Sequence, residues 1–503
     1  MSISAAEMDE TRCEQPEASL WLAVRRFARN GWLRILGISA VILVPCFWHH
    51  EIVAADLGSH LYNAWLVQLI HRGEAPGLWI APLHTNVLFD LLLSGLGSFF
   101  GLHAAEKIAV SLAVLIFYWG IFALVFAATR QPPWFLTPVI ALVTYGFTFH
   151  LGFFNYYLSL GVSFFSLAIL WRVTGWERWV GVAIAPLVFL AHPLGLFWLL
   201  GAGVYVLIQQ NTGRRGHIIL FVLAVAAIGL LHVFLFRYDH VSAAARPFYS
   251  FNGADQLVLF GERYRFVARA LLLFATLALA VDMLRSGHAH GGWRKYVLPL
   301  QLYLLTEVAV ALLPEAVAFP PPIAAAALLT ERLTSVSAAL GCCLLGVMRP
   351  SKWHLVASAA IAAVFFLFLY QDTSVVNKME SQIVELVSAL PPDQRVMATI
   401  VPPPGSRVLI QHILDRACIG WCFSYGNYEP GSGLFRVRAV PGNPYVLSDY
   451  DLAVDMEAGE YIVQPRDLPV YQIYQCSARG TDLCIRALEA GEENDRLGEH
   501  PNL

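Results

Sequence analysis

Residues 107–128 read KIAVSLAVLIFYWGIFALVFAA, and no charged side chain follows Lys107 in this stretch. An α-helix rises 1.5 Å per residue, so about 20 apolar residues cross the hydrocarbon core of a bilayer. The stretch therefore predicts a membrane-spanning helix.

Further stretches of the same kind occur along the chain. They lie near residues 33–48, 134–149, 155–171, 179–191, 193–208, 217–236, 265–284, 296–313, 323–347 and 353–370. Hydrophobic residues make up 57% of the 503 residues, charged residues 14%, and the mean hydropathy is +0.58. This composition excludes a soluble globular protein. We predict a polytopic α-helical membrane protein with about eleven transmembrane helices.

The distribution of basic residues predicts the orientation of these helices, because short cytoplasmic loops are enriched in Lys and Arg. Basic loops alternate with neutral ones if the apolar segment 86–101 is re-entrant or interfacial rather than a span. We then expect a cytoplasmic tail over 1–31 and a transmembrane domain over 32–371 with a large outer loop at 49–106. The loop 237–264 departs from the alternation, since it carries Arg246 on the outer side.

The tail over 372–503 has the composition of a small extracytoplasmic α/β or α+β domain. Val375–Leu390 predicts a helix, and 395–401, 434–440, 460–464 and 470–475 predict strands. The pairs Cys418/Cys422 and Cys476/Cys484 predict disulfides in an oxidising compartment, with a metal site as the alternative.

The outer loop opens with a dense group of ionisable residues, which close to lipid indicate function. Asp56, His60 and Asn63 lie within about 60° of one another on a helix, because they are spaced i, i+4 and i+7. A carboxylate and an imidazole would thus share one face. The alternative is that Asp56 caps the helix and the other two form its solvated side.

These features together resemble the C-type fold of membrane glycosyltransferases, which includes oligosaccharyltransferases, protein O-mannosyltransferases and lipid A aminoarabinose transferases. The resemblance rests on the short N-terminal tail, the single helix before a long outer loop that opens with an acidic residue, and the outer C-terminal domain. It implies a polyprenyl-phosphate or polyprenyl-diphosphate sugar donor. It also implies a catalytic carboxylate in the first outer loop.

That carboxylate maps onto Asp56, with Glu51 as the alternative and His60 beside it. In the second outer loop the sequence HLGFFNYY (150–157) offers His150 and Asn155 where several family members carry acidic residues. These residues predict no set of metal ligands and no cofactor, although dependence on a divalent cation remains an alternative. Arg suits the phosphate of the donor.

Two arginines are candidates for that phosphate. They are Arg246, for which a solvated loop charge is the alternative, and Arg332, which lies next to Glu331 in an apolar stretch and could instead tie two helices together. With Asn63, His150 and Asn155 they form the predicted substrate-binding set.

The function predicted from these residues is transfer of a sugar from a polyprenyl-phosphate donor to a lipid, glycan or protein acceptor at the outer face of a bacterial inner membrane. Membrane lipid is the expected surrounding. A net charge of -3 without a basic patch argues against nucleic acid as a partner. A transporter or lipid flippase and an envelope assembly protein are the alternatives.

Overall fold

The computed structural model describes residues 20–238, 240–242, 252–286, 294–318, 326–403, 405–410, 412–477 and 480–495. Arg246 and most of the predicted N-terminal tail lie outside these residues. The first helix begins at Leu20, so it includes the end of the segment that we expected to be a tail.

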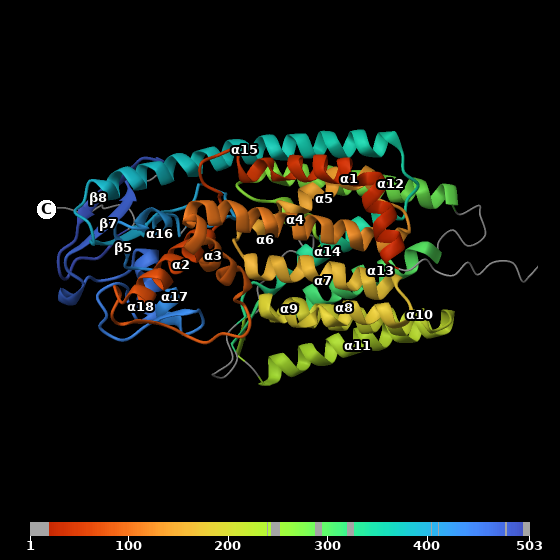
Figure 1. The fold of residues 1–503 in the computed structure, drawn as a ribbon, viewed down its shortest axis with the longest axis horizontal. Coiled ribbons are helices and arrows are strands. Elements are labelled where there is room, and N and C mark those ends of the chain that lie inside the picture. Colours follow the sequence, from red (N-terminus) through yellow and green to blue (C-terminus); the bar gives the residue numbers. More distant parts are fainter. Residues whose placement is uncertain are drawn as a thin grey trace, which may run out of the picture.

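The molecule is elongated, with a helical bundle at one end and a smaller mixed domain at the other (Figure 1). In chain order the bundle contains α1 (Leu20–Leu43), α4 (Leu102–Thr129), α5 (Thr137–Thr144), α6 (Phe147–His150), α7 (Phe154–Arg172), α8 (Trp179–Ala183), α9 (Ala185–Ala191), α10 (Pro193–Gln210), α11 (Arg214–Tyr238), α12 (Glu262–Ser286), α13 (Val297–Leu312), α14 (Leu329–Gly346) and α15 (Lys352–Ser388).

Seven helices of the described chain are long and apolar enough to cross a membrane, namely α4, α7, α10, α11, α12, α13 and α15. The remaining predicted spans coincide with α1, with the pairs α5–α6 and α8–α9, and with α14. A Pro near the start of α9 separates it from α8. The predicted polytopic helical fold with a small C-terminal domain is confirmed.

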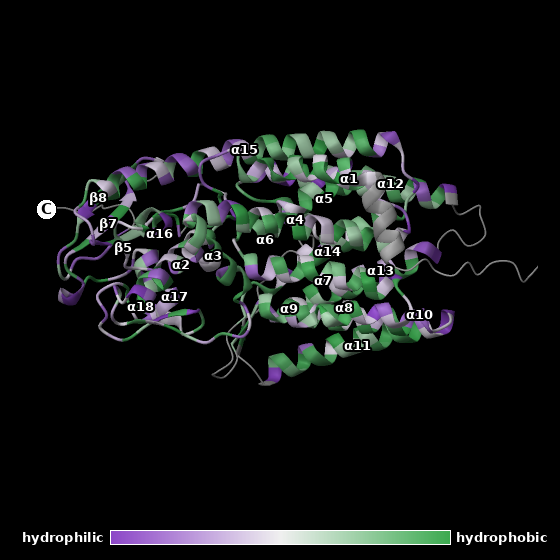
Figure 2. Ribbon diagram, in the orientation of Figure 1, coloured by the Kyte–Doolittle hydropathy of each residue, from purple (hydrophilic) through white to green (hydrophobic). Residues whose placement is uncertain are grey.

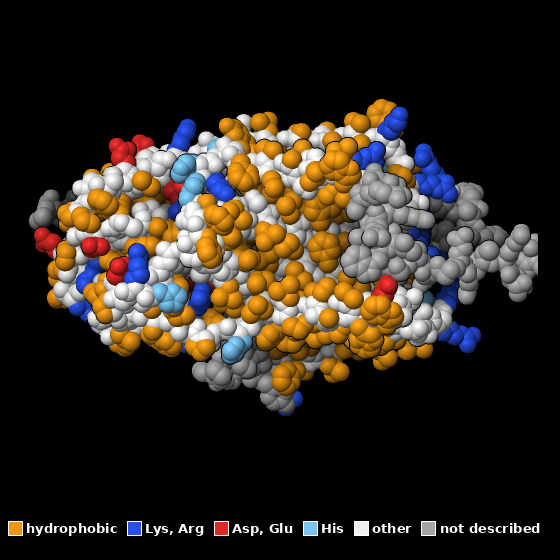
Figure 3. Space-filling view, in the orientation of Figure 1, with side chains coloured by type: hydrophobic (Ala, Val, Ile, Leu, Met, Phe, Trp, Pro, Cys, Tyr) orange, Lys and Arg blue, Asp and Glu red, His pale blue; other side chains and the backbone are white. Residues whose placement is uncertain are grey.

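The surface of the bundle is suited to lipid. Only 6% of the most apolar part of α11 is buried. Figure 2 shows apolar residues along the bundle helices, and Figure 3 shows hydrophobic side chains covering its face, with charged groups at the two ends. Inside the bundle, a Cβ on Gly120 would lie 2.5 Å from the carbonyl oxygen of Gly161, so α4 and α7 pack with their backbones in close contact.

The outer loop folds into α2 (Leu57–Arg72), β1 (Leu78–Ile80) and α3 (Leu88–Phe100). The 13 residues of α3 span only about 20 Å, which is too short to cross a bilayer. This length agrees with the prediction of a re-entrant or interfacial helix.

The C-terminal domain contains a four-stranded mixed sheet in the order β5-β4-β7-β8. Its strands are β4 (Arg395–Thr399), β5 (Phe423–Ser424), β7 (Val470–Gln475) and β8 (Leu483–Ala487), and its helices are α16 (Ile413–Cys418), α17 (Glu429–Ser432) and α18 (Tyr450–Ala458). Both predicted cysteine pairs form disulfides. The strand predicted over 460–464 is wrong, because this segment makes only an isolated bridge at Ile462.

The strand predicted over 434–440 is shorter and lies in another sheet. It forms β6 (Val437–Ala439), which pairs antiparallel with β1 of the outer loop. A second two-stranded sheet joins β2 (His240–Ser242) to β3 (Ala316–Ala318). Pairing between β1 and β6 ties the outer loop to the C-terminal domain.

The last span and the first helix of the C-terminal domain are one helix. α15 runs without a break over 37 residues, or about 56 Å, and passes along the whole molecule (Figure 1). Its first half is apolar and its second half is polar (Figure 2). The domain boundary predicted at residue 372 therefore falls inside a continuous helix.

Candidate active site between the bundle and the C-terminal domain

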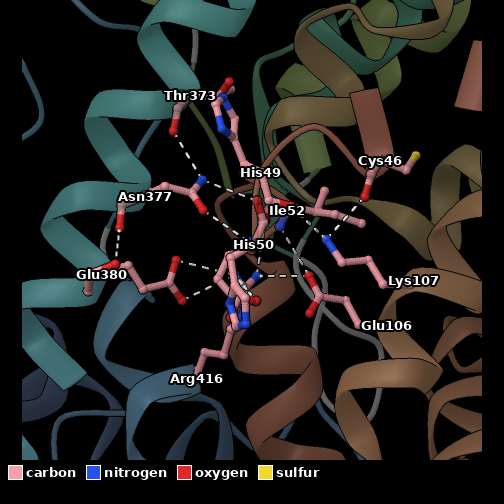
Figure 4. Close-up of polar contacts among 12 residues, drawn as sticks. Cys46, His49, His50, Ile52, Glu106, Lys107, Thr373, Asn377, Glu380 and Arg416 are labelled. Carbon is pink, nitrogen blue, oxygen red and sulfur yellow. Dashed lines mark hydrogen bonds and ion pairs between the residues drawn. The ribbon is translucent and has the colours of Figure 1, made fainter. Parts of the chain in front are cut away.

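The segment between α1 and α2 is held from three sides (Figure 4). Asn377 of α15 accepts from the backbone N–H of Glu51 at 2.9 Å and donates to its carbonyl at 3.1 Å. Arg416 of α16 donates to the carbonyl of Ile52 at 3.1 Å. Lys107 of α4 donates to the carbonyls of Cys46 and His49. The backbone that leads to Asp56 is thus fixed by both domains.

The turn between α6 and α7 fixes the last part of this segment. The N–H groups of Ala55 and Asp56 donate to the carbonyls of His150 and Leu151, and a His150 ring nitrogen contacts the carbonyl of Val53 at 2.9 Å. Gly152 has a φ of +80°, and a Cβ there would lie 2.5 Å from the Asp56 nitrogen. His150 therefore helps to position the backbone of Asp56, and the substrate contact predicted for it stays a prediction.

Asp56 stands at the start of α2, but its side chain makes no capping bond there. The cap of the alternative interpretation is absent because Asp56 has helical backbone angles (φ −80°, ψ −5°) rather than the extended conformation of capping residues. The solvated side of that alternative is wrong too, since His60 and Asn63 are buried. The C-terminal domain and α3 cover both polar residues, so α2 is enclosed between the two parts of the molecule.

His60 belongs to a chain of polar contacts. Its Nδ1 lies 2.7 Å from a carboxylate oxygen of Asp90 in α3. Asn155 of α7 donates to the other oxygen of Asp90 at 2.8 Å and accepts from the N–H of Phe89. Burial lowers the pKa of His60, but the Asp90 carboxylate outweighs this effect and raises the pKa to about 9. His60 is therefore a cation at neutral pH, and Asn155 positions its partner.

Asn63 joins α2 to the C-terminal domain. It donates to Ser59 and to Glu429 of α17. Burial raises the pKa of Glu429 to about 7. A cavity of about 20 Å³, large enough for a water molecule, lies beside this pair and is also lined by Asp90 and Arg436.

A second histidine approaches Asp56 from the C-terminal domain. His412 lies 2.8 Å from Asp415, and Ser424 donates to the same carboxyl group. Burial lowers the pKa of His412, but Asp415 raises it to about 10. A Cβ on Gly58 would overlap the carbonyl oxygen of His412, so α2 and this segment are in direct contact.

Arg332 reaches the site from α14. Its guanidinium lies over the ring of Phe153 at 4.2 Å, and its Nη1 contacts Nε2 of His192 at 2.9 Å. Among the described residues its Nε is buried and has no hydrogen-bond partner. An isolated histidine in an apolar segment more often bonds a neighbouring helix than a ligand. His232 does that, contacting the carbonyl of Leu312.

Asp56 is the group on which these charges converge. Burial raises its pKa, while the positive charges of His412, His60 and Arg332 act against that rise. The described residues provide no hydrogen bond to its carboxylate. The arrangement places a half-buried carboxylate beside His412, His60 and Arg332, and a carboxylate in this setting can accept a proton.

Glu51 lies in a different cluster. It pairs with Arg416 at 3.2 Å and with His50 at 2.6 Å. Of the predicted residues, the structure thus gathers Asp56, His60, Asn63, Asn155 and Arg332, with His150 behind them, and leaves Glu51 apart. It adds a set that the sequence did not single out, namely Asp90, His192, His412, Asp415 and Glu429. These residues lie far from Asp56 in the chain and carry no local signal.

No protein-family model matches this chain, and no curated protein matches it. Among solved structures, it is similar to one described as the crystal structure of ArnT from Cupriavidus metallidurans bound to undecaprenyl phosphate. The sequence identity is 13% and the TM-score 0.47, over 91% of this chain and 98% of that chain. The similarity concerns the course of the chain, and at this score it carries no argument about the reaction.

Proposed function

We propose that this protein transfers a sugar from a polyprenyl-phosphate donor to an acceptor at the outer face of the inner membrane, with Asp56 as the base. The observation that carries the proposal is that the half-buried, uncapped carboxylate of Asp56 lies in the field of the Arg332 guanidinium, whose Nε–H has no hydrogen-bond partner in the described part of the chain. One group comes from the outer loop and the other from the bundle. A lipid-linked donor needs a site that is open to both regions.

In this reaction the acceptor hydroxyl or amine attacks C1 of the sugar while the C1–O bond to phosphate breaks. Asp56 takes the proton of the acceptor, and its burial favours that transfer by raising its pKa. The leaving phosphate gains negative charge, which the fixed guanidinium of Arg332 stabilises. His60 and His412 oppose the rise in the pKa of Asp56 that burial causes.

The orientation is supported by charge. Lys and Arg gather at the end of the bundle away from the C-terminal domain (Figure 3), and cytoplasmic loops are enriched in these residues. The C-terminal domain is then periplasmic, where its two disulfides are stable.

The test is binding of undecaprenyl phosphate to purified protein by native mass spectrometry. Arg332→Ala should weaken binding and raise the apparent KM for donor, because a phosphate contact is lost. Arg265→Ala removes an exposed arginine that pairs with Glu262, and it should bind like the wild type. Equal binding by all three proteins would contradict the donor site. Wild-type protein that moves undecaprenyl phosphate across liposomes but never releases it from its sugar would favour a flippase.

A further inference from the structure

A group of ligand atoms lies at the outer end of α1, apart from Asp56. His50 and Glu51 follow α1, and His103 lies in the first turn of α4. One ligand atom from each of the three lies within 4.8 Å of the others. The rings of His50 and His103 stack with their centroids 4.9 Å apart.

We propose that His50, Glu51 and His103 bind a divalent transition-metal ion of the Zn²⁺ type. A set of two imidazoles and one carboxylate binds Zn²⁺ in preference to Mg²⁺ or Ca²⁺, because the latter two ions prefer oxygen ligands. Ligand atoms around tetrahedral Zn²⁺ lie about 3.3 Å apart, given bonds of about 2.0 Å. The His50 side chain is 80% exposed, so its ring can turn to close the remaining gap. A water molecule would complete the coordination.

Glu51 of this group also belongs to a network of charged side chains. Arg416 faces three carboxylates, those of Glu51, Glu106 and Glu380, at 3.1 to 3.4 Å. Lys107 lies beside them but donates to backbone carbonyls (Figure 4). Glu51 is the carboxylate of this set that also contacts His50. A metal ion on its outer side would share this carboxylate with Arg416.

The metal would have a structural effect on the loop. It would join the end of α1 to the start of α4 and hold Glu51, whose backbone is already fixed by Asn377. Asp56 lies five residues further on. The metal site would therefore stabilise the outer loop and take no part in the sugar transfer proposed above. The metal-site proposal does not depend on that reaction.

The test uses full-length protein purified without a histidine tag and stripped with a chelator. Zn²⁺ binding is measured by isothermal titration calorimetry, and Co²⁺ binding by its visible absorption. The variants are His50→Ala and His103→Ala, with His84→Ala as the control. His84 is also exposed in the outer loop but lies outside the group.

Wild type and His84→Ala should bind one ion with a rise in melting temperature, and both site variants should lose at least about tenfold in affinity. A Co²⁺ spectrum of tetrahedral type that disappears in His103→Ala would support the assignment. Wild-type protein that shows no saturable binding would overturn it. So would His103→Ala protein that binds Zn²⁺ as tightly as His84→Ala.

Discussion

Asp56→Asn is the sharpest perturbation of the proposed reaction, because the structure separates its chemical effect from a structural one. Asn has nearly the same size as Asp, and α2 receives no capping bond from this side chain. The fold therefore loses little. The substitution removes the carboxylate that faces His60, His412 and Arg332. It thereby also removes the group that takes the proton of the acceptor.

Loss of a positioned general base lowers turnover by about 10²- to 10⁴-fold. This corresponds to roughly 2.7 to 5.4 kcal/mol on the activation barrier, at 1.36 kcal/mol for each factor of ten. Donor binding should stay within a few-fold, because Asp56 does not contact the phosphate in the proposed arrangement. The effect should thus fall on kcat rather than on KM.

The assay is release of undecaprenyl phosphate from a panel of radiolabelled undecaprenyl-phosphate sugars by purified protein. Glu51→Gln is the matched control, since it removes a carboxylate of the same outer loop that pairs with Arg416 instead. Its effect should be on melting temperature. An active Asp56→Asn with an inactive Glu51→Gln would transfer the role to Glu51. If both variants turned over at the wild-type rate, the reaction as proposed would be wrong.

Three further predictions follow from the site and the topology. Gly152→Ala should cut turnover about tenfold or more, because the new Cβ displaces the backbone of the base; Gly73→Ala has a similar φ of +73° but open space around it and should stay active. Melting temperature should fall as pH rises from 4.5 through about 7, since Glu429 is buried and costly to ionise; the fall should be smaller in Glu429→Gln, and equal slopes would contradict the burial. A cysteine introduced at Val440 should react with an impermeant maleimide in intact spheroplasts, and mass spectrometry should find the Cys476–Cys484 disulfide; labelling only after lysis would reverse the orientation.

The sequence was informative where the signal is local. Apolar runs located the helices of the bundle, and the spacing of the cysteines gave both disulfides. The i, i+4, i+7 spacing placed Asp56, His60 and Asn63 together because a helix imposes that geometry. It could not show which element would cover that face, and so it left open the alternative of a solvated side, which the buried His60 and Asn63 rule out.

Contacts between distant segments had no such signal. His412 approaches Asp56, and Glu429 contacts Asn63, only because the C-terminal domain docks on α2. His192 became part of the site through Arg332, which lies on another helix. The boundary predicted at 372 lies inside α15, because polarity changes along this helix without any helix-breaking residue.

The pairing of β1 with β6 also has a consequence for how the protein is made. Leu78 leaves the ribosome well before its partner Ala439, which is 361 residues later in the chain. At about 5 to 20 residues per second, roughly 20 to 70 seconds separate them. During that time β1 has an unpaired edge and α2 lacks its cover. The candidate site therefore assembles last, only after the C-terminal domain has been synthesised.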